Sequence, residues 1–124
     1  MTSFAESVVE IKAVVQDYFD GIFYGDLNKL TTAFHPQCLL VGDINGQPYF
    51  KNLTDYLFGV KNRKSPNELG EAFRMKILSI ETQNEIAVVK LHVPMLGNNY
   101  YDYISLVRID GRWKILNKVF TNIA

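Results

Sequence analysis

Hydrophobic and polar positions alternate near the end of the chain, in the segment DYISLVRIDGRWKILNKVF from Asp102 to Phe120. Two alternating runs joined by Asp110-Gly111 are typical of a β-hairpin, because this dipeptide readily adopts the positive φ angles of a two-residue turn. With that turn, one face carries Ile104, Leu106, Trp113, Ile115 and Val119. The opposite face then carries Arg112, Lys114 and Lys118. A hairpin of this length needs further strands or covering helices, so it is expected to belong to a larger sheet.

A helical period precedes the strands. Ser3 and Glu6 form a capping box, the pattern that begins many helices. Apolar residues then recur every three or four positions, at Phe4, Val8, Ile11, Val15, Tyr18 and Ile22. Gly25 is predicted to end this helix, and Asp26 to cap a second one over residues 27–34 that stops before Pro36. A third helix is predicted from a cap at Asn52 or Thr54 to about Lys61.

The remaining segments read as strands. Short strands are predicted at residues 38–43 and 47–50, joined by a turn at Asn45-Gly46. After a polar surface loop at residues 62–70, strands at 73–82, 86–95 and 100–109 lead into the final hairpin as an antiparallel meander. Helices followed by a meander predict an α+β fold over residues 1–124, a single domain in which the helices cover a curved, mixed and mainly antiparallel sheet. Such a cone encloses a hollow, which is the default ligand site.

Composition narrows the function classes. The 124 residues carry no net charge, so the basic field that nucleic-acid binding requires is missing. Cys38 is the single cysteine and lies in an apolar strand, which favours a buried, inert thiol. The N-terminal segment lacks the pattern of a signal peptide, and no apolar run reaches the roughly 18–20 residues of a membrane span. A soluble cytoplasmic protein is therefore expected. His35 and His92 lie far apart without metal-ligand spacing, so neither a metal site nor a cofactor is expected.

The order of elements, together with YFDGIFYGDLNKLTTAFHP (residues 18–36) and YDYISLVRIDGRWKILNKVF (residues 101–120), resembles the nuclear transport factor 2-like superfamily. Within it, the chain is most similar to the bacterial Putative lumazine-binding family. The resemblance implies a cone-shaped, cystatin-like roll. The resemblance does not identify the function, since proteins with this fold include isomerases, cyclases, dehydratases and non-catalytic binding modules.

Ketosteroid-isomerase-like relatives offer a sharper comparison, because their catalytic groups are a tyrosine, a basic aspartate and a protonated acid. Alignment to that pattern places Tyr18 at the tyrosine, Gly42 at the base, with Asp43 next to it, and Ser105 at the acid, with Asp102 nearby. One role of three is matched residue for residue. The resemblance therefore argues against isomerase chemistry.

Polar residues on the apolar face of the hairpin are the first candidates for a site. Asp102 and Asn117 either bond to neighbouring strands or face the hollow and a ligand, and burial in the hollow would raise the pKa of Asp102. Tyr18 is either a donor in the pocket or a core residue, and Trp113 is either a core residue or a stacking wall. The ligand-binding candidates are Tyr18, Phe34, Tyr56, Asp102, Trp113 and Asn117.

Three functions remain open. The leading hypothesis is non-covalent binding of a small, flat organic ligand. The alternative is an isomerase, cyclase or dehydratase of the ketosteroid-isomerase-like or SnoaL-like kind, with Tyr18, His35 and Asp102 as catalytic candidates. A third is a pure association module. Apolar residues on the other hairpin face predict a homodimer through the sheet, because a soluble protein rarely exposes such a patch. They are Tyr101, Tyr103, Val107, Leu116 and Phe120.

Overall fold

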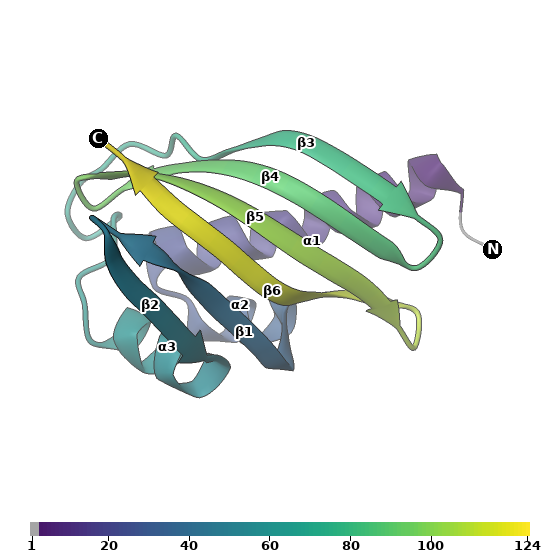
Figure 1. Cartoon of the computed structure of the whole chain (residues 1–124), viewed down its shortest axis with the longest axis horizontal. Coiled ribbons are helices and arrows are strands. Elements are labelled where there is room, and N and C mark those ends of the chain that lie inside the picture. Colours follow the sequence, from purple (N-terminus) through teal and green to yellow (C-terminus); the bar gives the residue numbers. More distant parts are fainter. Residues whose placement is uncertain (1–2) are drawn as a thin grey trace.

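Three helices lie against one face of a six-stranded sheet in the computed structural model, which describes residues 3–124 (Figure 1). The helices are α1 (Phe4–Tyr24), α2 (Leu27–Ala33) and α3 (Leu53–Lys61). The strands are β1 (Phe34–Ile44), β2 (Gln47–Asn52), β3 (Lys76–Gln83), β4 (Ile86–Met95), β5 (Asn98–Ile109) and β6 (Arg112–Ile123). Figure 1 views the uncovered face of the sheet, with α1 running behind the strands. The α+β class and the element order predicted from the sequence are confirmed.

Local capping chemistry sets the helix ends. The Ser3 side chain accepts a hydrogen bond from the backbone of Glu6 at 3.2 Å, and Gly25 ends α1 with a φ of 68°. The Asp26 carboxylate caps α2, and the Asn52 side chain caps α3. The predicted apolar stripe of α1 is buried from Ile11 to Ile22, whereas Val8 is half-buried and Phe4 is 64% exposed. Phe4 is exposed because the first turn of α1 lies at the end of the sheet (Figure 1).

The sheet has the strand order β2-β1-β6-β5-β4-β3, and β1 and β6 are its parallel pair. The other neighbouring strands pair antiparallel. The turns at Asn45-Gly46 and Asp110-Gly111, which join β1 to β2 and β5 to β6, have residues with positive φ, as predicted. Strand β1 begins earlier than expected, at Phe34, and contains Pro36. The β1–β6 register is interrupted between Phe34 and Leu39, so Pro36 sits where the ladder does not require its missing N–H.

A bulge in β6 changes which side chains enter the core. Ser105 pairs with Asn117, but Leu106 pairs with Ile115, so Leu116 is an extra residue on β6. Every side chain beyond the bulge therefore points to the face opposite the one that strict alternation predicts. Lys118 and Phe120 are accordingly buried, whereas Val119 is 51% exposed. The faces predicted from the sequence for these three residues are wrong, and the bulge is the reason.

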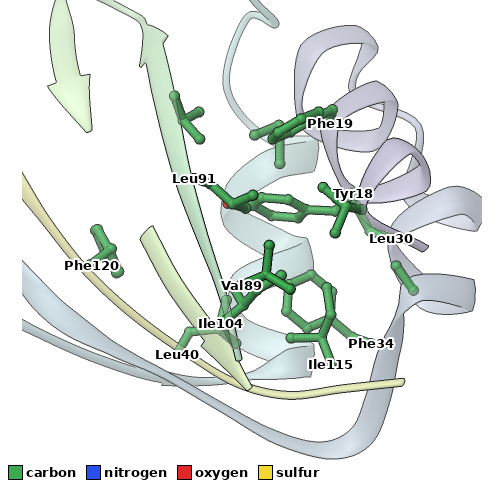
Figure 2. Packing of buried hydrophobic residues seen from close by; sticks show 14 of the residues in the cluster. Tyr18, Phe19, Leu30, Phe34, Leu40, Val89, Leu91, Ile104, Ile115 and Phe120 are labelled. Atoms are coloured by element: carbon green, nitrogen blue, oxygen red, sulfur yellow. The ribbon is translucent and has the colours of Figure 1, made fainter. Parts of the chain in front are cut away.

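The core fills the space between α1, α2 and the central strands. Figure 2 shows Tyr18 reaching from α1 toward the sheet, with Val89, Ile104 and Ile115 on the facing strands. The Tyr18 and Phe34 rings meet edge to face with centroids 5.6 Å apart. Trp113 is buried and donates its indole N–H to the Glu10 carboxylate at 3.0 Å. Within residues 3–124, no helix is both long enough and apolar enough to cross a membrane.

Candidate functional site

A cavity lined by polar and aromatic side chains lies between the helices and the sheet. The volume that the centres of water molecules can occupy is about 40 Å³, which leaves room for about three waters. With the solvent at its mouth included, the empty space is about 370 Å³. The lining residues are Tyr18, Ile44, Tyr49, Tyr56, Arg63, Val93, Met95, Tyr100, Asp102, Lys118 and Phe120. They come from α1, α3, strands β1, β2, β4, β5 and β6, and the connection after α3.

A chain of two hydrogen bonds crosses the closed end of this cavity. The Tyr18 hydroxyl donates to Asp102 Oδ2 at 2.5 Å, and Lys118 Nζ donates to Tyr18 Oη at 3.0 Å. All three side chains are buried, and Lys118 is only 5% exposed. A buried carboxylate and a buried ammonium each carry a large desolvation cost, which their mutual attraction offsets in part. The three side chains therefore form a buried, desolvated hydrogen-bonded cluster rather than a surface ion pair.

Burial moves the three groups toward their neutral forms. It raises the pKa of Asp102, while the Lys118 ammonium and the hydrogen bond from Tyr18 oppose that rise. Burial likewise lowers the pKa of Lys118, and Asp102 opposes the fall. The pKa of Tyr18 lies well above its usual range because of burial and the nearby Asp102 carboxylate. At neutral pH, Tyr18 is thus a donor that stays protonated.

Three aromatic rings surround the Lys118 amine. Nζ lies 4.7 Å from the ring centroids of Tyr56 and Phe120, and 5.2 Å from that of Tyr18. Ring faces attract an ammonium group, so they compensate part of its lost hydration. They also hold the Lys118 stem in one place and form flat walls against which a planar ligand can stack.

Two residues bring unpaired donors to the cavity. Within residues 3–124, the Tyr56 hydroxyl and the Arg63 Nε and Nη2 atoms are buried without a hydrogen-bond partner. Both residues line the cavity. A buried donor without an acceptor costs about 1–3 kcal/mol, and more when it is charged. A ligand with carbonyl or carboxylate oxygens would remove that cost on binding.

The structure brings together some of the residues singled out from the sequence. Tyr18, Tyr56 and Asp102 line the cavity, whereas Phe34 packs edge to face on Tyr18 and does not line it. Trp113 also lies outside the lining, bonded to Glu10.

Asn117 and His35 lie elsewhere. Asn117 is half-buried and follows the bulge residue Leu116, away from the cavity lining. The Nδ1 atom of His35 accepts a hydrogen bond from the backbone of Gln37 at 3.0 Å, and His35 also lies outside the lining. Within the described residues, no three His, Cys, Asp or Glu side chains are grouped so as to hold a metal ion.

Sequence reasoning missed Lys118 and Arg63. The available signal for Lys118 was the pair Ile115-Leu116, two adjacent apolar residues that break the alternation at the point where the bulge lies. Arg63 lies in a polar connection without periodicity, so no local pattern places it at a cavity.

The position aligned with the isomerase base is closed to any side chain. A Cβ atom built on Gly42 would lie 2.0 Å from the backbone oxygen of Phe120 on the neighbouring strand. A carboxylate at this position would require β6 to move. Asp102, by contrast, accepts the hydrogen bond of the Tyr18 hydroxyl and lines the cavity with it.

The fold and this roofed cavity define the nuclear transport factor 2-like class of proteins. A nuclear transport factor 2-like protein of unknown function from Shewanella baltica OS155 superposes with a TM-score of 0.87 at 17% identity, over 100% of this chain and 99% of that one. Another, from Silicibacter pomeroyi DSS-3, gives 0.85 at 19% identity, over 98% and 100%. Residues 6–121 match the model of the family described as Putative lumazine-binding, and the chain belongs to that family.

One relative carries the name of an enzyme. The chain is 29% identical over 110 residues to aldolase FrzH from Cladobotryum sp, which covers 83% of this chain and 81% of that protein. The family and this relative together suggest a small-molecule site.

Proposed function

We propose that this protein binds a small, flat organic molecule with a carbonyl or carboxylate group in the cavity. The observation that carries the proposal is the set of unpaired buried donors on Tyr56 and Arg63, which face the same cavity as Lys118. Aromatic walls favour a planar ligand, and the two cationic side chains favour an acceptor-rich one. The Tyr18 hydroxyl, which burial and Asp102 keep protonated, supplies a donor to a carbonyl oxygen at the closed end.

Thermal-shift and calorimetric titration with small carboxylates, including pyruvate and benzoate, tests the binding proposal. A ligand present at about 100 times its Kd stabilises the folded chain by about 2.7 kcal/mol, which raises the Tm by several degrees. Arg63→Gln is expected to weaken binding by about 10- to 100-fold, because it removes a charged hydrogen bond worth about 1.5–3 kcal/mol.

Lys64→Gln is the matched control, since Lys64 is the exposed basic neighbour of Arg63. It removes the same formal charge and should leave the affinity within about twofold of native, because exposed charges interact weakly. Equal losses in both variants would show that the effect is only long-range attraction. A panel without any shift, together with a crystal structure whose hollow is filled by side chains, would contradict the binding proposal.

Acid–base chemistry on a carbonyl compound is the second candidate function. It is favoured by the short Tyr18–Asp102 hydrogen bond and by the name of the FrzH relative. In this role Tyr18 donates to the carbonyl oxygen, and Asp102 exchanges the proton on the neighbouring carbon. Turnover that is lost in Tyr18→Phe, with ligand affinity kept, separates this enzyme from a binding protein. A pure association module would show neither binding nor turnover.

The protein is further proposed to form a homodimer through the uncovered face of the sheet. This face carries large exposed apolar side chains, namely Leu39, Leu78, Val88, Tyr103 and Val119. Tyr103 on β5 lies directly opposite Val119 on β6, and on its other side it pairs with Lys90 on β4, whose Nζ lies 5.4 Å from the Tyr103 ring centroid. An apolar patch on the open face of a sheet is a surface that a second copy can cover with two-fold symmetry.

Val119→Lys is expected to convert the dimer to a monomer, because it replaces an exposed apolar side chain of the patch with a second charge close to Lys90. The expected loss is about 2 kcal/mol or more, or roughly 30-fold in the dimer dissociation constant. Analytical ultracentrifugation over a concentration series measures it. Phe58→Lys is the control, since Phe58 is a similarly exposed apolar residue on α3, away from this face. A native chain that stays monomeric at high concentration contradicts the dimer.

A further inference from the structure

We infer that Lys118 is a nucleophilic amine that forms a covalent carbon–nitrogen bond with the carbonyl carbon of a ligand, of which 2-oxo acids are the best-fitting class. The inference rests on the proposed function, since a carbonyl compound must first enter the cavity. It begins from the bulge at Leu116, which turns Lys118 from the outer face of the sheet into the closed end of the cavity. No surface lysine of this chain has that environment among residues 3–124, where Lys118 is the one buried lysine.

The contacts of the amine leave it available. Within the described residues, Lys118 makes one hydrogen bond, to Tyr18 Oη, and no salt bridge within 4 Å. Its remaining surroundings are the rings of Tyr56 and Phe120. A lysine that served only to anchor the fold would be expected to place its three donors on acceptors. A single acceptor is enough for a neutral amine, whose lone pair then remains free to react.

Tyr18 connects the amine to the group that takes its proton. When the Lys118 ammonium passes a proton to Tyr18 Oη, the Tyr18 hydroxyl proton moves across the 2.5 Å hydrogen bond to Asp102. The products are a neutral amine, an unchanged tyrosine and a carboxylic acid. Burial favours this exchange because it removes two charges from a desolvated site, and it shifts the pKa values of Lys118 and Asp102 in that direction.

The covalent step follows from the same three residues. The amine lone pair forms a bond to the carbonyl carbon, the C=O π electrons move to oxygen, and Tyr18 relays a proton from nitrogen to that oxygen. The resulting carbinolamine then loses water: the nitrogen lone pair forms C=N, the C–O bond breaks, and the leaving hydroxyl takes the Asp102 proton through Tyr18. The products are an iminium on Lys118, one water molecule and the Asp102 carboxylate. The new cation therefore lies beside a carboxylate that can pair with it.

Arg63, which lines the same cavity as Lys118, favours the 2-oxo acid class of ligand. Arg63 presents two unpaired donor atoms, Nε and Nη2, and an arginine fork matches the two oxygens of a carboxylate. A 2-oxo acid carries its carboxylate next to the reacting carbonyl, so it is the smallest ligand that engages both groups. The limited space inside the cavity, about 40 Å³ open to the centres of water molecules, also favours a small compound.

Reductive trapping tests the inference directly. The native chain is incubated with pyruvate as the probe, sodium borohydride is added to reduce any iminium to a stable secondary amine, and the product is analysed by intact-mass spectrometry and peptide mapping. One adduct per chain is expected, at Lys118. Lys118→Met should abolish it, whereas Lys90→Met, which changes an exposed lysine on the other face of the sheet, should retain it. Mapping on the native chain gives the answer even if Lys118→Met does not fold.

The outcomes separate the two proposals. Saturable pyruvate binding by thermal shift without an adduct at Lys118 overturns the covalent inference and leaves the binding proposal standing. An adduct spread over the exposed lysines overturns it as well, because no special environment is then involved. Neither binding nor an adduct overturns both proposals for 2-oxo acids. A borohydride-dependent adduct at Lys118 alone, lost when excess benzoate competes for the cavity, supports both.

Discussion

Asp102→Asn is expected to lower the free energy of unfolding by about 3 kcal/mol at neutral pH, because it leaves Lys118 buried without its charge partner. The asparagine keeps the shape of the side chain and an acceptor for the Tyr18 hydroxyl, so packing changes little. Urea unfolding followed by circular dichroism measures the loss. Asp102→Asn combined with Lys118→Met is the matched comparison. That double variant is expected to recover most of the stability, since no unpaired charge remains.

The loss should shrink as the pH rises. Burial lowers the pKa of Lys118, and the Asp102 carboxylate opposes that fall. Without the carboxylate, the pKa of Lys118 in the folded variant is lower still. Below that folded pKa, both the folded and the unfolded chain bind the proton, and the penalty is constant. Between the folded value and the unfolded value of about 10.4, the unfolded chain binds more protons, so the stability of the variant increases with pH.

Other titratable groups lie around Lys118, and their titration could add to the pH dependence of unfolding. They are Tyr18, Cys38, Tyr49, Tyr56, Arg63 and Tyr100. Burial raises the pKa of each of these tyrosines and raises the pKa of Cys38 to about 11. Asp102→Asn and the double variant share these groups and differ only at residue 118, so the difference between these two variants isolates Lys118. A penalty for Asp102→Asn that is the same at pH 6 and at about pH 9 would mean that lost hydrogen bonding, not charge, is responsible.

Gly42→Ala is expected to destabilise the chain by about 3 kcal/mol, the upper end of the usual cost of overpacking. The new methyl carbon would lie 2.0 Å from the Phe120 carbonyl oxygen, and a backbone atom of the neighbouring strand cannot rotate away as a side chain can. The β1–β6 pairing would have to separate at this point, which would also displace Phe120 at the cavity wall. Urea unfolding measures the change.

Gly59→Ala is the comparison variant, and it is expected to change the stability in the opposite direction. Gly59 lies within α3, and the nearest atom to its added Cβ is the flexible end of Lys51 at 3.7 Å. Alanine in a helix is favoured over glycine by about 0.5–1 kcal/mol, so this variant should be more stable than native. If Gly42→Ala were as harmless as Gly59→Ala, the close approach of β1 to β6 would be disproved. The position would then be open to the carboxylate base of the isomerase pattern.

Much of the scaffold follows from short stretches of sequence. The Ser3–Glu6 capping box, Gly25 and the Asp110-Gly111 turn each act within a few residues, so their chemistry determines the ends of helices and hairpins wherever they occur. The order of helices and strands, read from such signals, was enough to predict the α+β class. It was also enough to place Tyr18, Tyr56 and Asp102 among the candidate site residues.

The site itself was decided by pairing between distant segments. Tyr18 lies 84 residues before Asp102 and 100 residues before Lys118, and no local pattern reports that their side chains meet. The alternation of β6 even predicts the wrong face for Lys118, because one extra residue at Leu116 reverses every later side chain. Sequence alone thus determined the elements and their order. Only the tertiary structure decided that an amine, a phenol and a carboxyl group share one desolvated cavity, because strand register is set by partners far along the chain.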